Sequence, residues 1–303
     1  MTRHPNLAAS VAARLLNRAK ETGDDYQTLL TTYCLERFLY RLGTSDRRDR
    51  FILKGAMLLR LWSDRPYRAT RDLDLLRRGD GTPHAIRHDL EAIVATPVPP
   101  DGVDFDGGRI SLEAMRAEDE YAGTRATLPA RCGQARLVLQ IDMGLGDAVW
   151  PPPEACTYPT LLDLPAPNLL AYPREVVVAE KLEAMVTLGD RNSRIKDFFD
   201  LHHVASRFPF DRTTLVEAVR RTFARRQTPI PDKVPIALTR AYWDNPSRPA
   251  QIRAFSRRTH VAAGEDFADE CSRILAAFLS PVLEDLRTNA APSGTWPPGG
   301  PWQ

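Results

Sequence analysis

The segment from Phe51 to Leu76 (FILKGAMLLRLWSDRPYRATRDLDLL) constrains the fold more than any other part of this 303-residue chain. An apolar run ends at Lys54 and Gly55, a short helical stretch follows, and a second apolar run carries Asp72 and Asp74. Side chains alternate between the two faces of a strand, so these acids share one face and the leucines beside them share the other. The pattern predicts two strands joined by a turn and a short helix, with two carboxylates on one face.

This acid pair favours a divalent-metal site. Two acids among apolar neighbours are costly to bury unless a cation lies between them. The turn at Lys54 and Gly55 lies just upstream, and a glycine turn at a helix N-terminus can hold phosphate through its backbone N–H groups. Together these features predict Mg²⁺-dependent chemistry on a nucleoside triphosphate. The structural alternative is an exposed acidic turn, or a strand end paired with the nearby arginines.

A third acid, Asp142, lies in the apolar run from Arg136 to Met143 (RLVLQIDM). If this run pairs beside the strand of Asp72 and Asp74, three carboxylates converge, as two Mg²⁺ ions about 3.5–4 Å apart require. One ion would lower the pKa of an attacking hydroxyl, and the other would bridge the triphosphate and stabilise the leaving pyrophosphate. Taken alone, Asp142 fits a structural role equally well.

The composition indicates a soluble globular protein, with 43% apolar and 26% charged residues. No window approaches 18 consecutive apolar residues, and the N-terminus lacks the pattern of a secretion signal, so we expect no membrane span. The four cysteines are scattered without ligand spacing, which is typical of reduced cytosolic thiols. We therefore expect a cytoplasmic protein.

Hydrophobic periodicity divides the chain into a helical lead, a small mixed-sheet domain and a helical domain, which is an α/β or α+β fold. The lead covers residues 1–45, the sheet domain residues 46–155 and the helical domain residues 165–288. Residues 289–303 are rich in Pro and Gly, and we expect them to be disordered. Strands are expected over residues 51–53, 70–76, 103–116 and 136–143.

Positive charge is concentrated between Arg207 and Arg258. Twelve Arg or Lys residues there face four acids, so this segment carries +8 and the rest of the chain −6, giving the net charge of +2. Such a segment fits a polyanion-binding surface beside a metal-binding core. The alternative is ordinary solvated helices in a chain that prefers Arg, because 36 of its 41 basic residues are Arg. The residues expected to contact RNA are Arg220, Arg221, Arg225, Arg226, Arg257 and Arg258.

A second candidate cluster lies between residues 174 and 201 (REVVVAEKLEAMVTLGDRNSRIKDFFDL). Lys181 lies beside the apolar stripe of the first helix, so it can reach toward a groove and pair with a triphosphate. It can also pair with the glutamates of its own helix. Asp197 and Asp200 share a helix face and can anchor Lys181, position arginines or contact substrate. We expect Lys181→Ala to abolish activity with little loss of fold, because a side chain that reaches to the surface contributes little to packing.

These motifs, in this order, resemble the AbiEii/AbiGii family of nucleotidyltransferase toxins, which includes the MenT toxins of mycobacteria. The similarity covers nearly the whole ordered chain and rests on YCLERFLYRLG, RFILKGAMLLRLW, RATRDLDL, LQIDMGLGD, REVVVAEKLEAMV and RIKDFFDLHHV. It implies a DNA-polymerase-β-like nucleotidyltransferase fold with a mixed sheet, a helical N-terminal lead and a helical C-terminal domain. It also implies that Mg²⁺ or Mn²⁺ is bound and that nucleotides pass from a nucleoside triphosphate to the tRNA 3′ end, which blocks translation. An antitoxin from the same operon would counter the toxin.

The resemblance also implies roles for individual residues. Asp72 and Asp74 match the metal-binding acids, Thr70 matches a Ser or Thr just before them, and Asp142 matches a third acid. Lys181 matches a helical lysine needed for activity, and the acids of the KDxxDL motif correspond to Asp197 and Asp200. The expected catalytic residues are therefore Asp72, Asp74, Lys181, Asp197 and Asp200, with phosphate contacts from Lys54, Gly55, Ala56, Thr70 and Lys181.

Ala56 departs from the family pattern, which has a small or hydroxyl residue after the motif glycine. Its backbone N–H can still bind phosphate, but a side-chain hydroxyl is missing.

Three functional hypotheses follow from these features. The first is a metal-dependent nucleotidyltransferase toxin acting on RNA, and the second is a small-molecule nucleotidyltransferase or a Mg²⁺-dependent nuclease. The third is a degenerate NTP or RNA binder, which Ala56 keeps open. The basic segment favours the first over the second because a polyanionic acceptor needs a basic track. We expect a monomer whose partners are tRNA or another RNA and an antitoxin encoded nearby.

Overall fold

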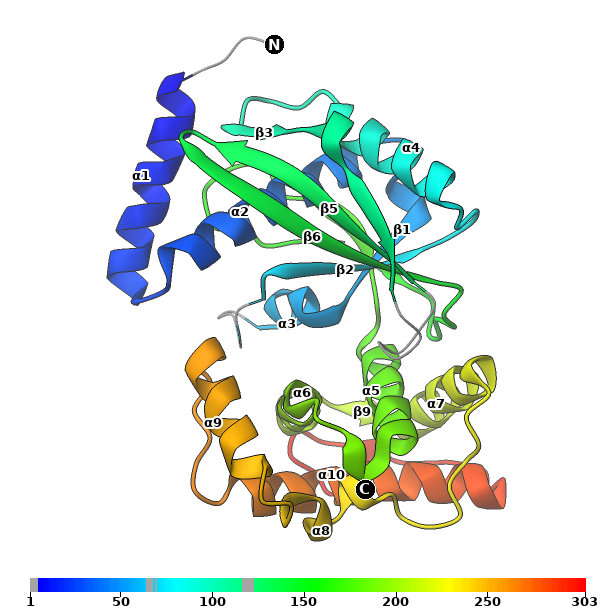
Figure 1. Ribbon diagram of the computed structural model, residues 1–303. Helices are drawn as coiled ribbons and strands as arrows, with labels where there is room; N and C mark the ends of the chain where they lie inside the picture. The colour runs from blue at the N-terminus through cyan, green and yellow to red at the C-terminus, as the bar shows by residue number, and fades with distance from the viewer. Residues whose placement is uncertain (1–4, 64–67, 69, 116–122) are drawn as a thin grey trace. The chain divides into compact units, whose positions relative to one another are not determined.

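The computed structural model describes residues 5–63, 68, 70–115 and 123–303 and divides the chain into two compact units (Figure 1). Unit 1 comprises residues 1–146 and 154–171, and unit 2 comprises residues 147–153 and 172–303. The helical lead expected at residues 1–45 is therefore part of the same unit as the sheet.

A mixed sheet forms the core of unit 1. Over the described residues the strand order is β3-β5-β6-β2-β1-β8-β7, and β4 also pairs with β5. In the centre, β2 pairs antiparallel with β1 and parallel with β6. The strand of Asp142 thus lies beside that of Asp72, which is the condition under which Asp142 could join the other two acids. The strands are β1 Phe51–Lys54, β2 Asp72–Arg77, β3 Val103–Phe105, β4 Ser111–Ala114, β5 Gly123–Cys132, β6 Ala135–Leu145, β7 Glu154–Thr157 and β8 Asn168–Ala171.

Three parts of this sheet differ from the sequence prediction. Strands β7 and β8 were not predicted, and β8 lies within residues 165–288, which were expected to be helical. The single strand expected over residues 103–116 is broken by a 3₁₀ turn, Gly107–Arg109, into β3 and β4, and residue 116 lies outside the described residues. Strand β5 was not predicted, because its buried positions are mostly small and it contains Pro129, which cannot donate a ladder hydrogen bond. The carbonyl of Pro129 still accepts from the backbone N–H of Asp106 at 2.9 Å.

The helices of unit 1 support the sheet. The expected helical lead forms two helices, and the Asp25 side chain caps the second by accepting a hydrogen bond from the Thr28 N–H at 2.8 Å. Figure 1 shows α2 crossing a face of the sheet, where it packs against β6, β8 and α4. The helices are α1 Pro5–Thr22, α2 Tyr26–Thr44, α3 Leu58–Leu61 and α4 Pro83–Ala95, with 3₁₀ turns η1 Arg48–Arg50 and η2 Gly55–Met57.

Unit 2 is helical, as expected. Helix α5 packs against α7, and α6 packs against α9 and α10. Stacked aromatic rings fill its core, with centroid distances of 4.0 Å between Phe199 and Phe267 and 4.4 Å between Phe198 and Tyr242. The elements are α5 Arg174–Leu188, α6 Ile195–Arg207, α7 Arg212–Arg226, α8 Arg240–Trp243, α9 Arg248–Thr259 and α10 Phe267–Thr288, with short strands β9 Phe210–Asp211 and β10 Thr295–Trp296.

Among the described residues, no helix is both long enough and apolar enough to cross a membrane.

The prediction of a disordered tail over residues 289–303 is wrong. Strand β10 pairs antiparallel with β9, and Trp296 is 1% exposed. The indole N–H of Trp296 donates to the Ala205 carbonyl at 2.7 Å, and that of Trp302 donates to the Phe278 carbonyl at 3.0 Å. Two tryptophans supply enough apolar surface to hold a Pro- and Gly-rich segment on unit 2, which composition alone does not reveal.

Candidate active site

The two β2 acids lie where strand alternation places them. Leu73 and Leu75 are fully buried, whereas Asp72 is exposed and Asp74 is half-buried on the other face. The shared face is confirmed. The expectation that both acids are costly to bury does not hold for Asp72, because its side chain is exposed. We call this pair the β2 carboxylates.

The Gly55 turn is in close contact with one of these acids. Lys54 is the register partner of Asp74 in the β1–β2 ladder, so the turn that follows β1 begins beside Asp74. Gly55 has a φ of 70°, and a Cβ built on it would overlap the Asp74 carboxylate. Glycine is therefore required here both by its backbone conformation and by the space that the acid occupies.

Asp142 lies beside Asp74 in the sheet, but its carboxylate is bound by Arg125. It pairs with Asp74 in the β2–β6 ladder, so both side chains are on the same face. Its carboxylate, however, accepts two hydrogen bonds from Arg125 on β5, at 2.8 and 2.9 Å, and one from Gln140 at 3.2 Å. Within the described ranges, no group of three or more His, Cys, Asp or Glu could hold a metal ion. The conditional convergence of three carboxylates is thus not seen there, and the Asp142 carboxylate is paired with Arg125 instead.

Arg125 is a candidate site residue that the sequence analysis missed. It lies directly opposite Asp142 in the β5–β6 ladder, and its side chain is 40% exposed. In the sequence, GTRATLPARC alternates small or apolar residues with more polar ones, which is a strand pattern. Its proline weakens that pattern, so the strand and Arg125 were missed.

The remaining residues fit a divalent cation. Asp72 and Asp74 offer carboxylate oxygens from one strand face, the ligand type that Mg²⁺ and Mn²⁺ prefer. The missing Cβ of Gly55 lets the Asp74 carboxylate lie directly against the turn. Thr70 bonds to the main chain that enters β2, with its Oγ accepting from the Asp72 N–H at 3.4 Å. Ala56 is half-buried in η2.

The second cluster is assembled within unit 2 by α5 and α6. The Lys181 ammonium pairs with the Asp197 carboxylate and, at 3.0 Å, with Asp200. The three side chains are 17%, 6% and 2% exposed, respectively. Of the three roles left open for the two acids, the structure shows that they anchor Lys181, and we call these three residues the Lys181 cluster. One cation between two buried carboxylates leaves a formal charge of −1.

The glutamates beside Lys181 have a different partner, which corrects the prediction for Arg226. The Arg226 side chain is 5% exposed and pairs with Glu183 at 2.7 Å, Glu180 at 3.5 Å and Asp147 at 3.7 Å. A buried arginine that neutralises three acids is not placed to contact RNA. The tertiary reason is that α7 packs against α5 along the face that carries Arg226.

The other predicted RNA-contacting arginines fall into two groups. On α7, Arg220 and Arg221 both pair with Glu217, and Arg221 also lies 4.3 Å from the centroid of the Trp150 ring. Arg225 is exposed on the same helix. On α9, exposed side chains without an ion-pair partner among the described residues are Arg253, Arg257 and Arg258. Residues 245–264 contain no acid, so the surface of α9 is basic.

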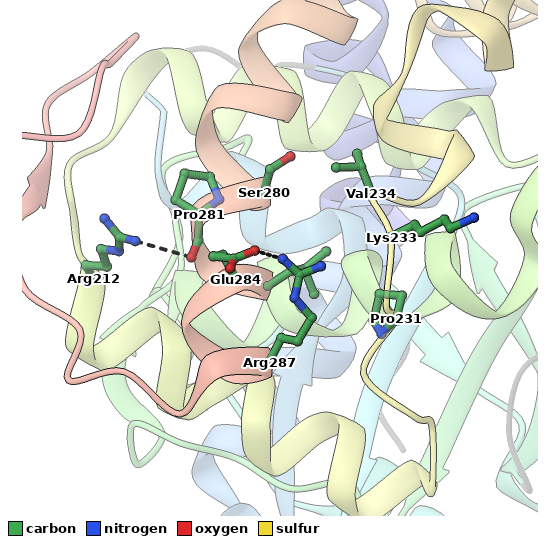
Figure 2. Close-up of a pocket in the computed structure, with 9 residues that line it drawn as sticks. Arg212, Pro231, Lys233, Val234, Ser280, Pro281, Glu284 and Arg287 are labelled. Atoms are coloured by element: carbon green, nitrogen blue, oxygen red, sulfur yellow. Dashed lines mark hydrogen bonds and ion pairs between the residues drawn. The ribbon is translucent and has the colours of Figure 1, made fainter.

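A pocket of about 360 Å³ also lies in unit 2, between the start of α7, residues 231–234 and the second half of α10. Figure 2 shows that its charged lining is largely paired, with Arg287 bound to Glu284 and Arg212 bound to the Pro281 carbonyl, while Lys233 points away from both. The pocket contains none of the predicted site residues, so it is separate from the candidate active site.

Comparisons with known proteins agree with this architecture. The structure is similar to a crystal structure of a candidate nucleotidyltransferase from H. pylori, with 13% identity and a TM-score of 0.50, over 88% of this chain and 100% of that one. A second similar structure is JHP933 from Helicobacter pylori, with 12% identity and a TM-score of 0.49, over 88% of this chain and 95% of that one. The first likeness supports the fold alone. No curated protein sequence matches the chain.

The comparison with protein families shows the family of the chain as well as its fold. The family described as nucleotidyl transferase AbiEii toxin, type IV TA system, matches residues 37–288, a range that includes every predicted site residue. The chain therefore belongs to the AbiEii nucleotidyl transferase toxin family of type IV toxin–antitoxin systems.

Proposed function

We propose that this chain is a metal-dependent nucleotidyltransferase toxin that transfers nucleotides from a nucleoside triphosphate to RNA, with the tRNA 3′ end as acceptor, and so blocks translation. The observation that carries the proposal is the contact between the Gly55 turn and Asp74. A glycine turn against a carboxylate brings backbone N–H donors for phosphate next to an acid that can bind a cation. Family membership supports the nucleotidyltransferase reaction.

In this proposal, the residues of unit 1 bind the triphosphate. Asp72 and Asp74 would hold Mg²⁺ or Mn²⁺, a cation that would neutralise phosphate charge and lower the pKa of an acceptor hydroxyl. Lys54 adds a positive charge, and the backbone N–H groups of Gly55 and Ala56 are available to phosphate oxygens. The absent hydroxyl at Ala56 is compatible with this role because the contact is made by the main chain.

The Lys181 cluster supplies a fixed cation. Two buried carboxylates orient the ammonium group of Lys181, so little side-chain entropy remains to be lost when it pairs with a phosphate. An ammonium has three donors, so bonds to Asp197 and Asp200 are compatible with a further bond to substrate. During transfer, the acceptor hydroxyl gives up its proton to water, its oxygen bonds to the α-phosphorus, and the bond from that phosphorus to pyrophosphate breaks.

The acceptor in this proposal is a polyanion bound along α9. Arg253, Arg257 and Arg258 are exposed on a helix without acids, whereas Arg226 is buried and Arg220 shares an acid with its neighbour. A long polyanion gains affinity from each exposed Arg or Lys that neutralises a phosphate. This supports RNA over a small-molecule acceptor. The cognate antitoxin encoded nearby and the monomeric state remain part of the same proposal.

The test is incubation of the protein with Mg²⁺, total tRNA and each labelled nucleoside triphosphate in turn. We expect label on the tRNA, and a loss of at least about 100-fold in Asp74→Ala, as for removal of a group that stabilises transition-state charge. Asp104→Ala is the matched control, because Asp104 is an exposed acid on β3 of the same sheet.

Each other outcome contradicts the proposal in a defined way. Shortened RNA would indicate a nuclease, and label on a small molecule would indicate another acceptor class. Binding of triphosphate without transfer to any acceptor would indicate a degenerate binder. Equal transfer by wild type and Asp74→Ala would refute the site assignment.

A further inference from the structure

Glu36 is a fully buried acid of unit 1 that belongs to none of the predicted site residues. It lies on α2, and its Oε1 accepts a hydrogen bond from Arg60 on α3 at 2.6 Å. Its Oε2 accepts from the backbone N–H of Leu161 at 2.9 Å. The Glu36 and Arg60 side chains are 0% and 13% exposed. One carboxylate therefore ties together α2, α3 and the segment between β7 and β8.

The helix that Arg60 belongs to continues directly from the Gly55 turn. Helix α3 begins at Leu58, immediately after η2, so a shift of α3 moves the turn. A second buried contact reaches η2 itself, since the Tyr158 hydroxyl donates to the Met57 carbonyl at 3.3 Å. The turn thus has buried partners behind it, while Gly55 has no room for even a Cβ beside Asp74.

We propose that Glu36 is a positioning residue, which holds the Gly55 turn against Asp74 through its ion pair with Arg60. The consequence for catalysis rests on the proposed function, whereas the restraint on the turn does not. Glu36→Gln removes the carboxylate that holds the Arg60 guanidinium, so α3 is free to move toward water and solvate Arg60. The turn then loses its fixed distance from Asp74.

The protonation state of Glu36 provides a signature of this role. Burial raises the pKa of Glu36 to about 7, while Arg60, the Leu161 N–H and Arg37 act to lower it. Tyr158 is a further titratable group that faces it. The folded chain binds this proton more tightly than the unfolded chain, whose ordinary value is 4.5. Its contribution to folding stability is therefore complete below pH 4.5 and lost as the pH rises through 7, whereas the ion pair forms as the pH rises through 7.

The experiment compares Glu36→Gln and Arg60→Gln with a matched control, Asp101→Asn. Asp101 forms an equally buried ion pair with Arg41 of α2 at 2.6 Å, in the same unit. Hydrogen exchange measured by mass spectrometry reports on residues 55–61, and steady-state kinetics reports on KM for the triphosphate. If a Glu36 variant does not fold, Tyr158→Phe tests the same turn by removing a single hydroxyl.

We expect exchange in residues 55–61 to rise about tenfold in both test variants and to stay unchanged in Asp101→Asn, because a charge-assisted hydrogen bond is worth about this factor. KM for the triphosphate should rise by a similar factor, and its pH dependence near 7 should disappear in Glu36→Gln. Unchanged exchange in a folded Glu36→Gln and in Tyr158→Phe would overturn the inference, even with normal transfer by the wild type. Increased exchange with no transfer by the wild type would refute the proposed function and leave the positioning role intact.

Discussion

The β2 carboxylates and the Lys181 cluster are two acidic sites built in different ways. Asp72 is exposed and Asp74 half-buried, and strand alternation places both on one face. In the Lys181 cluster, Asp197 and Asp200 are buried and share one lysine from another helix. The first site keeps its acids near water, and the second neutralises them inside the protein.

This difference determines how substitutions should act at each site. An exposed acid contributes little to folding, so its removal tests function alone. A buried carboxylate that loses its cation keeps a charge with no compensation, so folding and function change together. The two sites therefore need different controls.

The largest expected effect is that of Lys181→Ala. It leaves Asp197 and Asp200 without their cation, and we expect a loss of about 3 kcal/mol in the free energy of unfolding, measured by urea denaturation. This replaces the sequence-based expectation of little loss of fold. Lys196→Ala is the control, because Lys196 is exposed on the same helix as the acids. Equal stability of the two variants would show that the ion pairs do not stabilise unit 2.

Asp74→Asn should show the opposite behaviour. We expect transfer activity to fall by about 10²–10³-fold, as when a preorganised charge-stabilising group is removed, while the unfolding midpoint shifts less than in Lys181→Ala. Asp142→Asn should lose less activity, because Arg125 already occupies that carboxylate. Equal losses in the labelled-triphosphate assay would show that Asp142 contributes to the metal site as much as Asp74 does.

The two basic helices of unit 2 differ in the same way, because the arginines tested on α7 are paired with an acid and those tested on α9 are exposed. Replacing Arg257 and Arg258 of α9 by Ala should weaken tRNA binding and reduce the slope of log K against log salt by about 1.5. Replacing Arg220 and Arg221 of α7 should have less effect, since both are paired with Glu217. Filter binding at several salt concentrations measures both slopes. A larger effect of the α7 substitutions than of the α9 substitutions would show that RNA binds along α7 instead.

The smallest expected effect is a pH dependence of folding stability that arises from His203, next to the Lys181 cluster. Burial, with help from Arg207, lowers the pKa of His203 from 6.5 to about 4, although Asp200 acts to raise it. The unfolded chain therefore takes up this proton first, so stability is full above pH 6.5 and falls as the pH drops toward 4. Thermal unfolding of His203→Gln should lack this decline, whereas His88→Gln, at an exposed position, should retain it. A decline that persists in His203→Gln would assign it to another group.

Sequence reasoning was most successful where structure follows local periodicity. Helix α5, Arg174–Leu188, forms where the sequence predicts a helix that carries Lys181, and the shared face of the β2 acids follows from strand alternation. Strand β5 was missed because small buried residues and Pro129 give a weak strand signal.

The sequence by itself determined the order of the motifs, the family, the helical character of unit 2 and the residues that share a face. Only the tertiary structure decided the partner of each charge: Arg125 for Asp142, three acids for Arg226, and Asp197 with Asp200 for Lys181. The tertiary structure also decided that residues 289–303 are ordered, because the Trp296 indole N–H donates to a carbonyl 91 residues away. The physical reason is that face and period are set by backbone geometry over a few residues. Ion pairs and burial depend on contacts between segments that are distant in sequence, and no local pattern encodes them.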